Sequence, residues 1–165
     1  MNKKSGFTLA EVLVTLMIIG VIAAMTIPSL MQSTSSQEYK AAFKKAVSML
    51  NQAVTLNYAL DGEDASDYTG TNFVNLMKTR LNVMSEDSAK NAVYTADGMY
   101  FKAMAGGSCT DTDACAKVEV DVNGAKGPNK PTTATNKVFD IFTINIYAQK
   151  ALPSETFQQQ VLYSK

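Results

Sequence analysis

The feature that most constrains this chain is an uninterrupted apolar stretch, residues 7–27, with the sequence FTLAEVLVTLMIIGVIAAMTI. It contains 21 residues and a single ionisable side chain, Glu11. As an α-helix that rises about 1.5 Å per residue it would be about 31 Å long, which matches the ~30 Å hydrocarbon core of a bilayer. Lys3 and Lys4 precede the stretch and are predicted to stay in the cytoplasm. We therefore expect a single-pass membrane protein whose C-terminal part is exported.

Glu11 is the unusual residue of this stretch. A carboxylate inside a membrane helix costs about 3 kcal/mol even on insertion-based scales, so it marks a functional residue by default. A purely structural explanation is also open, because Glu11 lies in the first helical turn. There the helix dipole favours an anion and the lipid headgroups are near.

The sequence KSGFTLAEVLVTLMIIGVIAAM resembles the N-terminal signature of type IV prepilins and type II secretion pseudopilins. The resemblance implies that a prepilin peptidase cuts after Gly6, removing residues 1–6, and then methylates the new N-terminal amine of Phe7. It also implies that Glu11 is retained and meets the amine of Phe7 on an adjacent subunit, which fixes the axial register of a filament.

The same resemblance implies the location and the partners. The precursor would sit in the bacterial inner membrane, and the filament would be periplasmic or on the cell surface. Its partners would be identical or related pilin subunits, the prepilin peptidase and an inner-membrane assembly platform.

An ordinary secretory signal peptide is the competing interpretation of the same stretch. It would have Lys3 and Lys4 as its basic region and Ala23-Ala24 as its small-residue cleavage site. That interpretation leaves Glu11 and the Gly6–Phe7 junction unexplained.

The helix is predicted to continue well beyond the membrane, from about Thr8 to Leu60, and to end at Asp61-Gly62. Its amphipathic part, within residues 28–60, has apolar side chains at three- and four-residue steps: Tyr39, Phe43, Val47, Leu50, Val54 and Tyr58. A short separate helix after a loop at residues 29–36 is the alternative, because STSSQ is a weak helix former.

Gly20 and Pro28 mark a region where the helix should kink or loosen, since proline lacks a backbone donor and clashes with the carbonyl four residues back. The resemblance implies that the segment between them extends when subunits assemble. Pro28 as a simple marker of the membrane exit is the other interpretation.

The remaining sequence predicts a small α+β domain, residues 61–165, which packs with residues 36–60. The expected elements are a loop at 62–72, a helix at 71–83, a loop at 85–91, a hairpin around Asp97-Gly98, strands at 117–123 and 138–147, and a mostly irregular tail at 148–165 with one short turn or strand near 161–163. A stem helix on a three- or four-stranded antiparallel sheet is the pilin-like fold.

The two cysteines, Cys109 and Cys115, are expected to form a disulfide because they lie in the exported part of the chain. The loop that they enclose is short, so the bridge would mainly fix a local turn. Two thiols without a histidine make an incomplete metal site.

Composition argues against catalysis and against nucleic-acid binding. The chain has no histidine, which removes the commonest general base, and no nucleophile–base pair, P-loop or GxGxxG motif is present. Acidic and basic side chains are equal in number at 15 each, so no basic patch points to nucleic acid. We expect a protein that is not an enzyme; an anchored hydrolase would have no identifiable catalytic set.

The second informative region is EVDVNGAKGPN, followed by Asp140 in FDIF. It resembles a DVNG-x-x-GPN…D-x-F pattern of pseudopilin-like proteins, and the resemblance to major pseudopilins implies a calcium site in the C-terminal loops. The candidate ligands are Glu119, Asp121, Asn123 and Asp140. An EF-hand is excluded because Lys130 stands where the bidentate acid is required. The structural alternative is that Asn and Asp side chains cap a tight turn, with Asp140 accepting hydrogen bonds from the GPN loop.

These features together predict a structural filament subunit, with the DVNG pattern favouring a secretion pseudopilin over other pilins. The alternative is a monomeric membrane-anchored module that binds calcium or a glycan through residues 121–129. Such a module would function without the prepilin peptidase.

Overall fold

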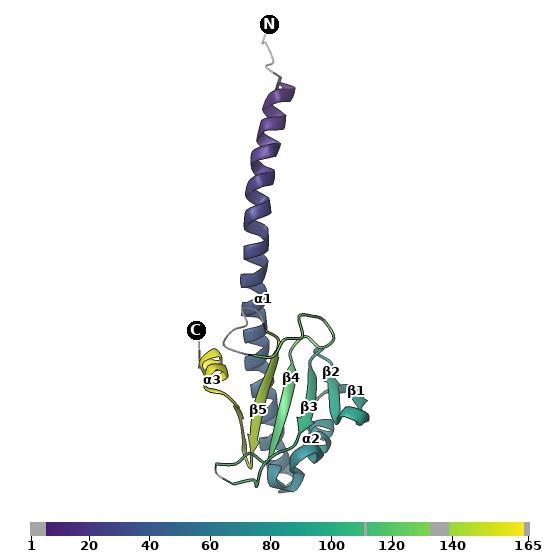
Figure 1. Ribbon diagram of the computed structural model, residues 1–165. Helices are drawn as coiled ribbons and strands as arrows, with labels where there is room; N and C mark the ends of the chain where they lie inside the picture. The colour runs from purple at the N-terminus through teal and green to yellow at the C-terminus, as the bar shows by residue number, and fades with distance from the viewer. Residues whose placement is uncertain (1–5, 111, 133–138, 164–165) are drawn as a thin grey trace. The chain divides into compact units, whose positions relative to one another are not determined.

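The computed structural model describes residues 6–110, 112–132 and 139–163 (Figure 1). The chain divides into two compact units, Met1–Ser35 and Ser36–Lys165, and the boundary falls within the first helix. The predictions that concern Lys3, Lys4 and Val138 lie outside the described residues.

Helix α1, Leu9–Asp61, is 53 residues long and matches the predicted range to within one residue at each end. It continues through Pro28, which excludes the alternative of a short separate helix after a loop at residues 29–36. Gly62 ends it as expected: its φ is +73°, and its N–H donates to Tyr58 O at 3.0 Å.

In the first unit the apolar side chains of α1 face outward. Phe7 is 90% exposed, and the large apolar side chains from Leu9 to Met31 are exposed along the helix. Among the described residues, α1 is the one helix that is long and apolar enough to cross a membrane. The part of the helix that meets this criterion is not buried by the rest of the structure, as expected for a segment that is covered by lipid or by other subunits.

The second unit contains a six-stranded antiparallel sheet in the order β1-β2-β3-β4-β5-β6, a simple meander. Its strands are β1 (Val83–Asp87), β2 (Ala92–Thr95), β3 (Tyr100–Met104), β4 (Ala116–Asp121), β5 (Ile141–Tyr147) and β6 (Lys150–Pro153). The predicted hairpin and the two predicted strands are present, but the expected count of three or four strands is wrong.

The two outer strands are what the sequence pattern does not predict. The pattern predicts a loop at residues 85–91, yet most of β1 lies there and pairs with β2 through a register shift between Val83 and Ser85. β1 has no apolar alternation because it is an exposed edge strand, and its order comes from backbone pairing. β6 is only four residues long and ends at Pro153, so its apolar pattern is too short to recognise.

The shorter helices show a similar mixture of agreement and correction. α2 (Phe73–Arg80) confirms the predicted helix at 71–83, although its first turn is replaced by a 3₁₀ turn at Gly70–Asn72. α3 (Thr156–Tyr163) corrects the expectation of an irregular tail. Further 3₁₀ turns occupy Ala65–Tyr68 and Ser88–Lys90.

The core of this unit lies between the sheet and the C-terminal half of α1, with α2 on the same core. The rings of Phe43 on α1 and Phe142 on β5 stack with centroids 4.1 Å apart. Along β5, Phe142, Ile144 and Ile146 are fully buried, while the alternating residues are half-buried. This one-sided burial is typical of an antiparallel sheet that is covered by helices on one face.

Asn51 connects α1 to the edge strand β6. Its Nδ2 donates to Ala151 O at 3.0 Å, and its Oδ1 accepts from Ala151 N at 2.8 Å. The side chain thus pairs with both backbone groups of Ala151, as a neighbouring strand would do. This contact fixes the last strand of the sheet to the stem helix.

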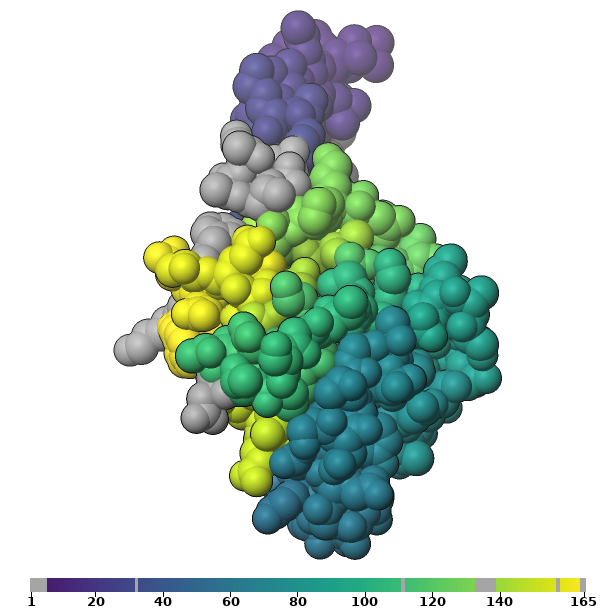
Figure 2. Space-filling view, turned by 60° about the horizontal axis from the view of Figure 1, so that its bottom comes forward, coloured from purple at the N-terminus to yellow at the C-terminus, as the bar shows by residue number. Residues whose placement is uncertain are grey.

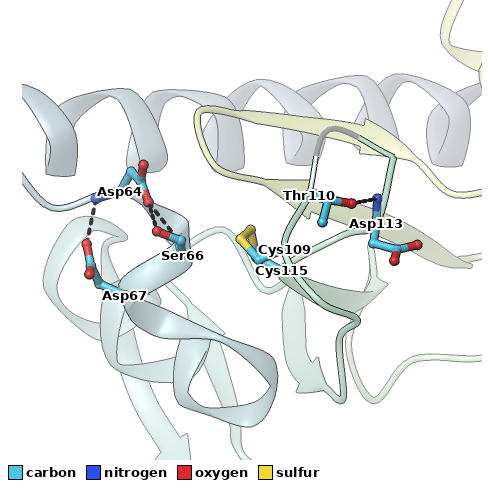
Figure 3. The surroundings of a disulfide bond; sticks show 7 residues. All are labelled: Asp64, Ser66, Asp67, Cys109, Thr110, Asp113 and Cys115. Atoms are coloured by element: carbon cyan, nitrogen blue, oxygen red, sulfur yellow. Dashed lines mark hydrogen bonds between the residues drawn. A yellow bond between two sulfur atoms is a disulfide. The ribbon is translucent and has the colours of Figure 1, made fainter.

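The predicted disulfide between Cys109 and Cys115 is present (Figure 3). Cys115 is fully buried, its N–H donates to Ile146 O at 2.7 Å, and its carbonyl accepts from Gly70 N at 2.9 Å. Figure 3 places the bridge between the turn that contains Thr110 and Asp113 and the 3₁₀ turn capped by Asp64. The disulfide therefore ties the surface loop that begins at Cys109 to Cys115. The backbone of Cys115 is in turn hydrogen-bonded to β5 through Ile146 and to the residues after α1 through Gly70.

Candidate functional site

The first candidate site is the N-terminal end of α1, where Thr8 and Glu11 form a reciprocal capping pair. Thr8 N and Thr8 Oγ1 donate to Glu11 Oε2 at 2.8 and 2.9 Å, and Glu11 N lies 3.3 Å from Thr8 Oγ1. This is the capping box of a T-x-x-E sequence, which satisfies backbone donors that the first helical turn leaves free. The structural explanation of Glu11 as a first-turn anion therefore holds within one subunit.

The surroundings of Glu11 are open and apolar. A shallow pocket of about 410 Å³ is lined by Phe7, Glu11, Val12 and Thr15. Gly6 and Phe7 are both exposed, so the backbone between them is accessible to another protein. The carboxylate capped by Thr8 is thus also within reach of an external partner.

Gly20 and Pro28 lie in the same apolar part of α1, and a Cβ built on Gly20 would meet no atom within 4 Å. The hydroxyls of Thr26 and Thr34 donate to the carbonyls of Ile22 and Leu30, each at 3.0 Å. The structure holds this segment in one helical state. Its extension on assembly stays a proposal.

The second candidate site is the loop that joins β4 to β5, and Asp140 organises it. Asp140 is fully buried; its Oδ2 accepts from Asn129 N at 2.8 Å and its Oδ1 from Lys130 N at 2.7 Å. The prediction that Asp140 accepts from the GPN loop is confirmed. Both carboxylate oxygens are therefore already engaged in holding the loop.

Asp121, at the end of β4, is 8% exposed and closes the other side of the loop. Its Oδ1 accepts from Asn123 N at 3.2 Å. Burial, together with the nearby carboxylates of Asp140 and Glu119, raises the pKa of Asp121 to about 6, although hydrogen bonds from the backbone partly oppose this effect.

Asn129 is the residue of this loop that the sequence does not single out. It has a φ of +49°, and its side-chain amide lies 3.0 Å from Lys126 O, 3.2 Å from Gly124 O and 3.2 Å from Asp121 Oδ2. All three are acceptors, so the amide nitrogen is assigned to face them. The sequence GPN predicts a turn, but only the fold shows that the Asn129 amide contacts several parts of the loop at once.

Gly124 has the tightest backbone contact of the loop. Its φ is +64°, and a Cβ at this position would lie 2.7 Å from Gly98 O. Gly98 belongs to the turn of the β2–β3 hairpin, so the DVNG turn packs directly against that hairpin. Only glycine combines this backbone conformation with so close an approach.

The four predicted calcium ligands are only partly gathered. The carboxylates of Asp140 and Glu119 both lie near enough to Asp121 to raise its pKa, but Glu119 also pairs with Lys102 at 3.8 Å. Asn123 donates from Nδ2 to Gly127 O at 3.0 Å, and its Oδ1 is buried without a hydrogen-bond partner in the part of the chain that the structure describes. Among those residues no group of three His, Cys, Asp or Glu side chains is arranged to hold a metal ion.

Thr8 is a site residue that the sequence reasoning misses, although the T-x-x-E spacing is a readable signal. The cleavage motif assigns roles to Gly6, Phe7 and Glu11 but none to Thr8. The Thr8 hydroxyl and N–H are what position the Glu11 carboxylate in the isolated chain.

In a comparison with known families, residues 1–27 match the family model described as the prokaryotic N-terminal methylation motif. No curated protein and no solved structure matches the chain. The motif is typical of type IV pilins and pseudopilins, which are structural subunits and not enzymes. The described part of this motif begins a long, initially apolar helix whose C-terminal half packs on an antiparallel sheet, which is an α+β pilin-like architecture.

Proposed function

We propose that this protein is a structural subunit of a type II secretion pseudopilus or of a type IV pilus-like filament. It is cut by prepilin peptidase after Gly6, is N-methylated at Phe7 and polymerises through its apolar helix. The observation that carries the proposal is the methylation motif over residues 1–27, whose part from Leu9 onward lies on α1 with exposed apolar side chains. In a membrane these side chains face lipid, and in a filament they face other subunits.

Glu11 gives the assembly its register in this proposal. Cleavage creates a charged amine at Phe7, and two opposite charges in an apolar environment stabilise each other when they pair. The carboxylate lies beside an open apolar pocket, where the amine of a neighbouring stem can reach it. Successive head-to-tail contacts of this kind build an open helix and not a closed ring.

The proposal also gives a location and a set of partners. The precursor is a single-pass protein of the bacterial inner membrane with its C-terminal unit outside the cytoplasm. It meets related subunits, the prepilin peptidase and an assembly platform, and residues 20–28 extend as the filament grows. The DVNG-x-x-GPN loop favours a secretion pseudopilus.

Mass spectrometry of the protein purified from its native membrane tests the proposal. We expect a chain that begins at Phe7 and carries one added methyl group on its amine. A Gly6→Val variant should keep its first six residues and form no filament. A mature chain that begins at Met25, or a protein that functions as a monomer without the peptidase, contradicts the proposal.

We also propose a calcium ion at the β4–β5 loop, as a second property of the same subunit. The supporting observation is the buried Asn123 Oδ1, which has no hydrogen-bond partner among the described residues and lies close to Asp121. The pKa of Asp121 is raised first by burial and then by the nearby carboxylate of Asp140. Asn123 Oδ1 and the Asp121 carboxylate would bind the ion; Asp140 would keep its present role in the loop.

Thermal unfolding of the full chain in detergent, with calcium or with a chelator, tests this second proposal. Calcium should raise the Tm of the wild type and leave the Asp121→Asn variant unchanged, while magnesium at the same concentration should act on neither. Equal unfolding temperatures with calcium and with chelator contradict it.

A further inference from the structure

A hollow of about 670 Å³ lies where the β2–β3 turn meets the β4–β5 loop, within the second unit. The meander brings this turn and this loop to the same end of the sheet (Figure 1). The loop residues, light green in Figure 2, lie at the surface. The volume is within the range of about 300–1,000 Å³ that is usual for small-molecule sites. We call the hollow the tyrosine pocket; its lining consists of Glu38, Tyr39, Tyr94, Asp97, Gly98 and residues 122–127.

The walls of the tyrosine pocket are held in place by contacts between three elements. Asp97 in the β2–β3 turn forms an ion pair with Lys45 of α1, with Nζ 3.0 Å from Oδ2. The same turn packs directly against the β4–β5 loop at Gly124. Within that loop, Asn123 Nδ2 donates to Gly127 O at 3.0 Å. A hollow that is already formed costs a ligand little ordering entropy on binding.

Two tyrosines give the pocket its apolar surfaces. Tyr39 on α1 and Tyr94 on β2 are both half-buried and both line the hollow. The Tyr94 ring packs against Tyr100, with ring centroids 4.8 Å apart, and the Tyr39 hydroxyl lies 3.5 Å from Gly127 O. Each ring therefore has a fixed position and offers an apolar body with a polar tip.

The charges around the tyrosine pocket cancel. Asp97 is neutralised by Lys45. The exposed Glu38 carboxylate and the exposed Lys126 ammonium have opposite signs. A charged ligand would lose its hydration here without finding a net opposite charge, so the pocket favours a neutral ligand.

The polar side chains of the lining require hydrogen-bond donors from a ligand. Glu38 and Asp97 present carboxylate oxygens, which only accept. The amide of Asn123 already uses its donor on Gly127 O. A ligand that suits this lining is neutral, carries several hydroxyl donors and has an apolar C–H face for the tyrosine rings. This combination is the chemistry of a sugar ring.

We propose that the tyrosine pocket binds a neutral saccharide of one or two rings. Tyr39 and Tyr94 pack against the C–H faces of the sugar, Glu38 and Asp97 accept from its hydroxyls, and Lys126 donates to one of its oxygens. The site lies within one copy of the chain, so it is independent of the proposed filament function. It also does not use the two side-chain groups proposed to bind calcium.

Saturation-transfer NMR on the full chain tests the proposal, in a phosphocholine detergent because glycosidic detergents would compete. The probes are glucose, galactose, mannose, N-acetylglucosamine, cellobiose, lactose and diacetylchitobiose. At least one of these sugars should bind with a Kd in the millimolar range or tighter. Glucosamine and glucuronic acid, which add a charge to the glucose ring, should bind more weakly than glucose or cellobiose.

Variants locate the binding site. Tyr39→Leu and Tyr94→Leu keep an apolar side chain but remove the ring, so each should weaken binding about tenfold. Lys126→Met removes a donor from an exposed loop position without a change in the core, and it should also weaken binding. Tyr163→Leu is the matched control, because Tyr163 is 75% exposed on α3 and does not line the pocket.

Three results overturn the proposal. The first is that no sugar of the panel binds to the wild type. The second is that binding survives unchanged in Lys126→Met and in every tyrosine-pocket variant that folds, as its thermal unfolding shows. The third is that a charged sugar binds more tightly than its neutral counterpart.

Discussion

At the scale of single residues, the buried carboxylate of Asp121 makes the stability of the C-terminal unit depend on pH. Its pKa is about 6 in the folded chain, against an ordinary value of 3.8. Between these values the folded state holds more protons than the unfolded state, so stability falls as pH rises from about 4 to about 6. The loss is up to about 3 kcal/mol.

The Asp121→Asn variant tests this expectation because it keeps an acceptor oxygen and removes the charge. Unfolding temperatures of the variant and the wild type, measured in detergent without calcium from pH 4 to pH 7, should diverge as pH rises, with the variant gaining relative stability. Parallel curves would show that Asp121 does not titrate in this range.

Gly124 is a second residue whose identity the fold determines. Substitution by alanine places a Cβ 2.7 Å from Gly98 O at a φ of +64°, so the Gly124→Ala variant should lose about 1–2 kcal/mol to the backbone conformation and more to the clash. Gly98→Ala is the matched comparison, because Gly98 has a φ of +82° but a methyl group added there would meet no atom within 4 Å. Denaturant unfolding should rank Gly124→Ala clearly below Gly98→Ala, and equal stabilities would contradict the close packing of the two turns.

At the scale of elements, the side chain of Asn51 links β6 to α1. Asn51→Ala removes both hydrogen bonds to Ala151, which is fully buried, and leaves its N–H and C=O without those partners. We expect a loss of about 2–3 kcal/mol and faster amide exchange in β6. Gln52→Ala, one position along on the exposed side of the same helix, should change stability by less than about 0.5 kcal/mol. Unchanged exchange in β6 would contradict the role of Asn51.

The elements also show what the sequence can and cannot predict. α1 is predictable to within one residue at each end, because its periodicity is long and Asp61-Gly62 is a clear stop signal. The hairpin around Asp97-Gly98 is predictable for the same kind of local reason. β1, β6 and α3 are not. β1 is ordered by backbone pairing with the adjacent β2, and β6 by pairing with β5 and with the distant Asn51, so neither shows a recognisable apolar pattern of its own.

The candidate sites likewise contain residues whose roles can be predicted from the sequence and residues whose roles cannot. The motif at Gly6, Phe7 and Glu11 is local in sequence, so it can be read directly and matches a family model. The role of Asp140 is readable from the GPN pattern. The contacts of the Asn129 amide are not, because they require two backbone carbonyls and the carboxylate of Asp121 to come together in the fold. Sequence spacing alone places Glu119 among the candidate calcium ligands, whereas in the fold its position on β4 gives it Lys102 as an ion-pair partner.

At the scale of the whole molecule, the central question is whether Glu11 acts within its own helix or between subunits. Within one chain it caps the helix through Thr8. In the proposed filament it neutralises the amine of Phe7 on a neighbour. The two roles predict different outcomes when the two residues are changed separately.

Glu11→Val removes the carboxylate and therefore both roles, whereas Thr8→Val removes the capping hydroxyl and keeps the carboxylate. If the charge pair between subunits dominates, Glu11→Val should insert and be processed but yield few filaments or filaments out of register, and Thr8→Val should retain most of the assembly. Helix capping contributes about 1 kcal/mol, too little to abolish insertion of a segment this apolar. Filament yield and helical order, measured by electron microscopy of sheared filaments, decide between the roles. Normal filaments from Glu11→Val would remove the pairing role, and equal defects in both variants would assign the effect to the cap.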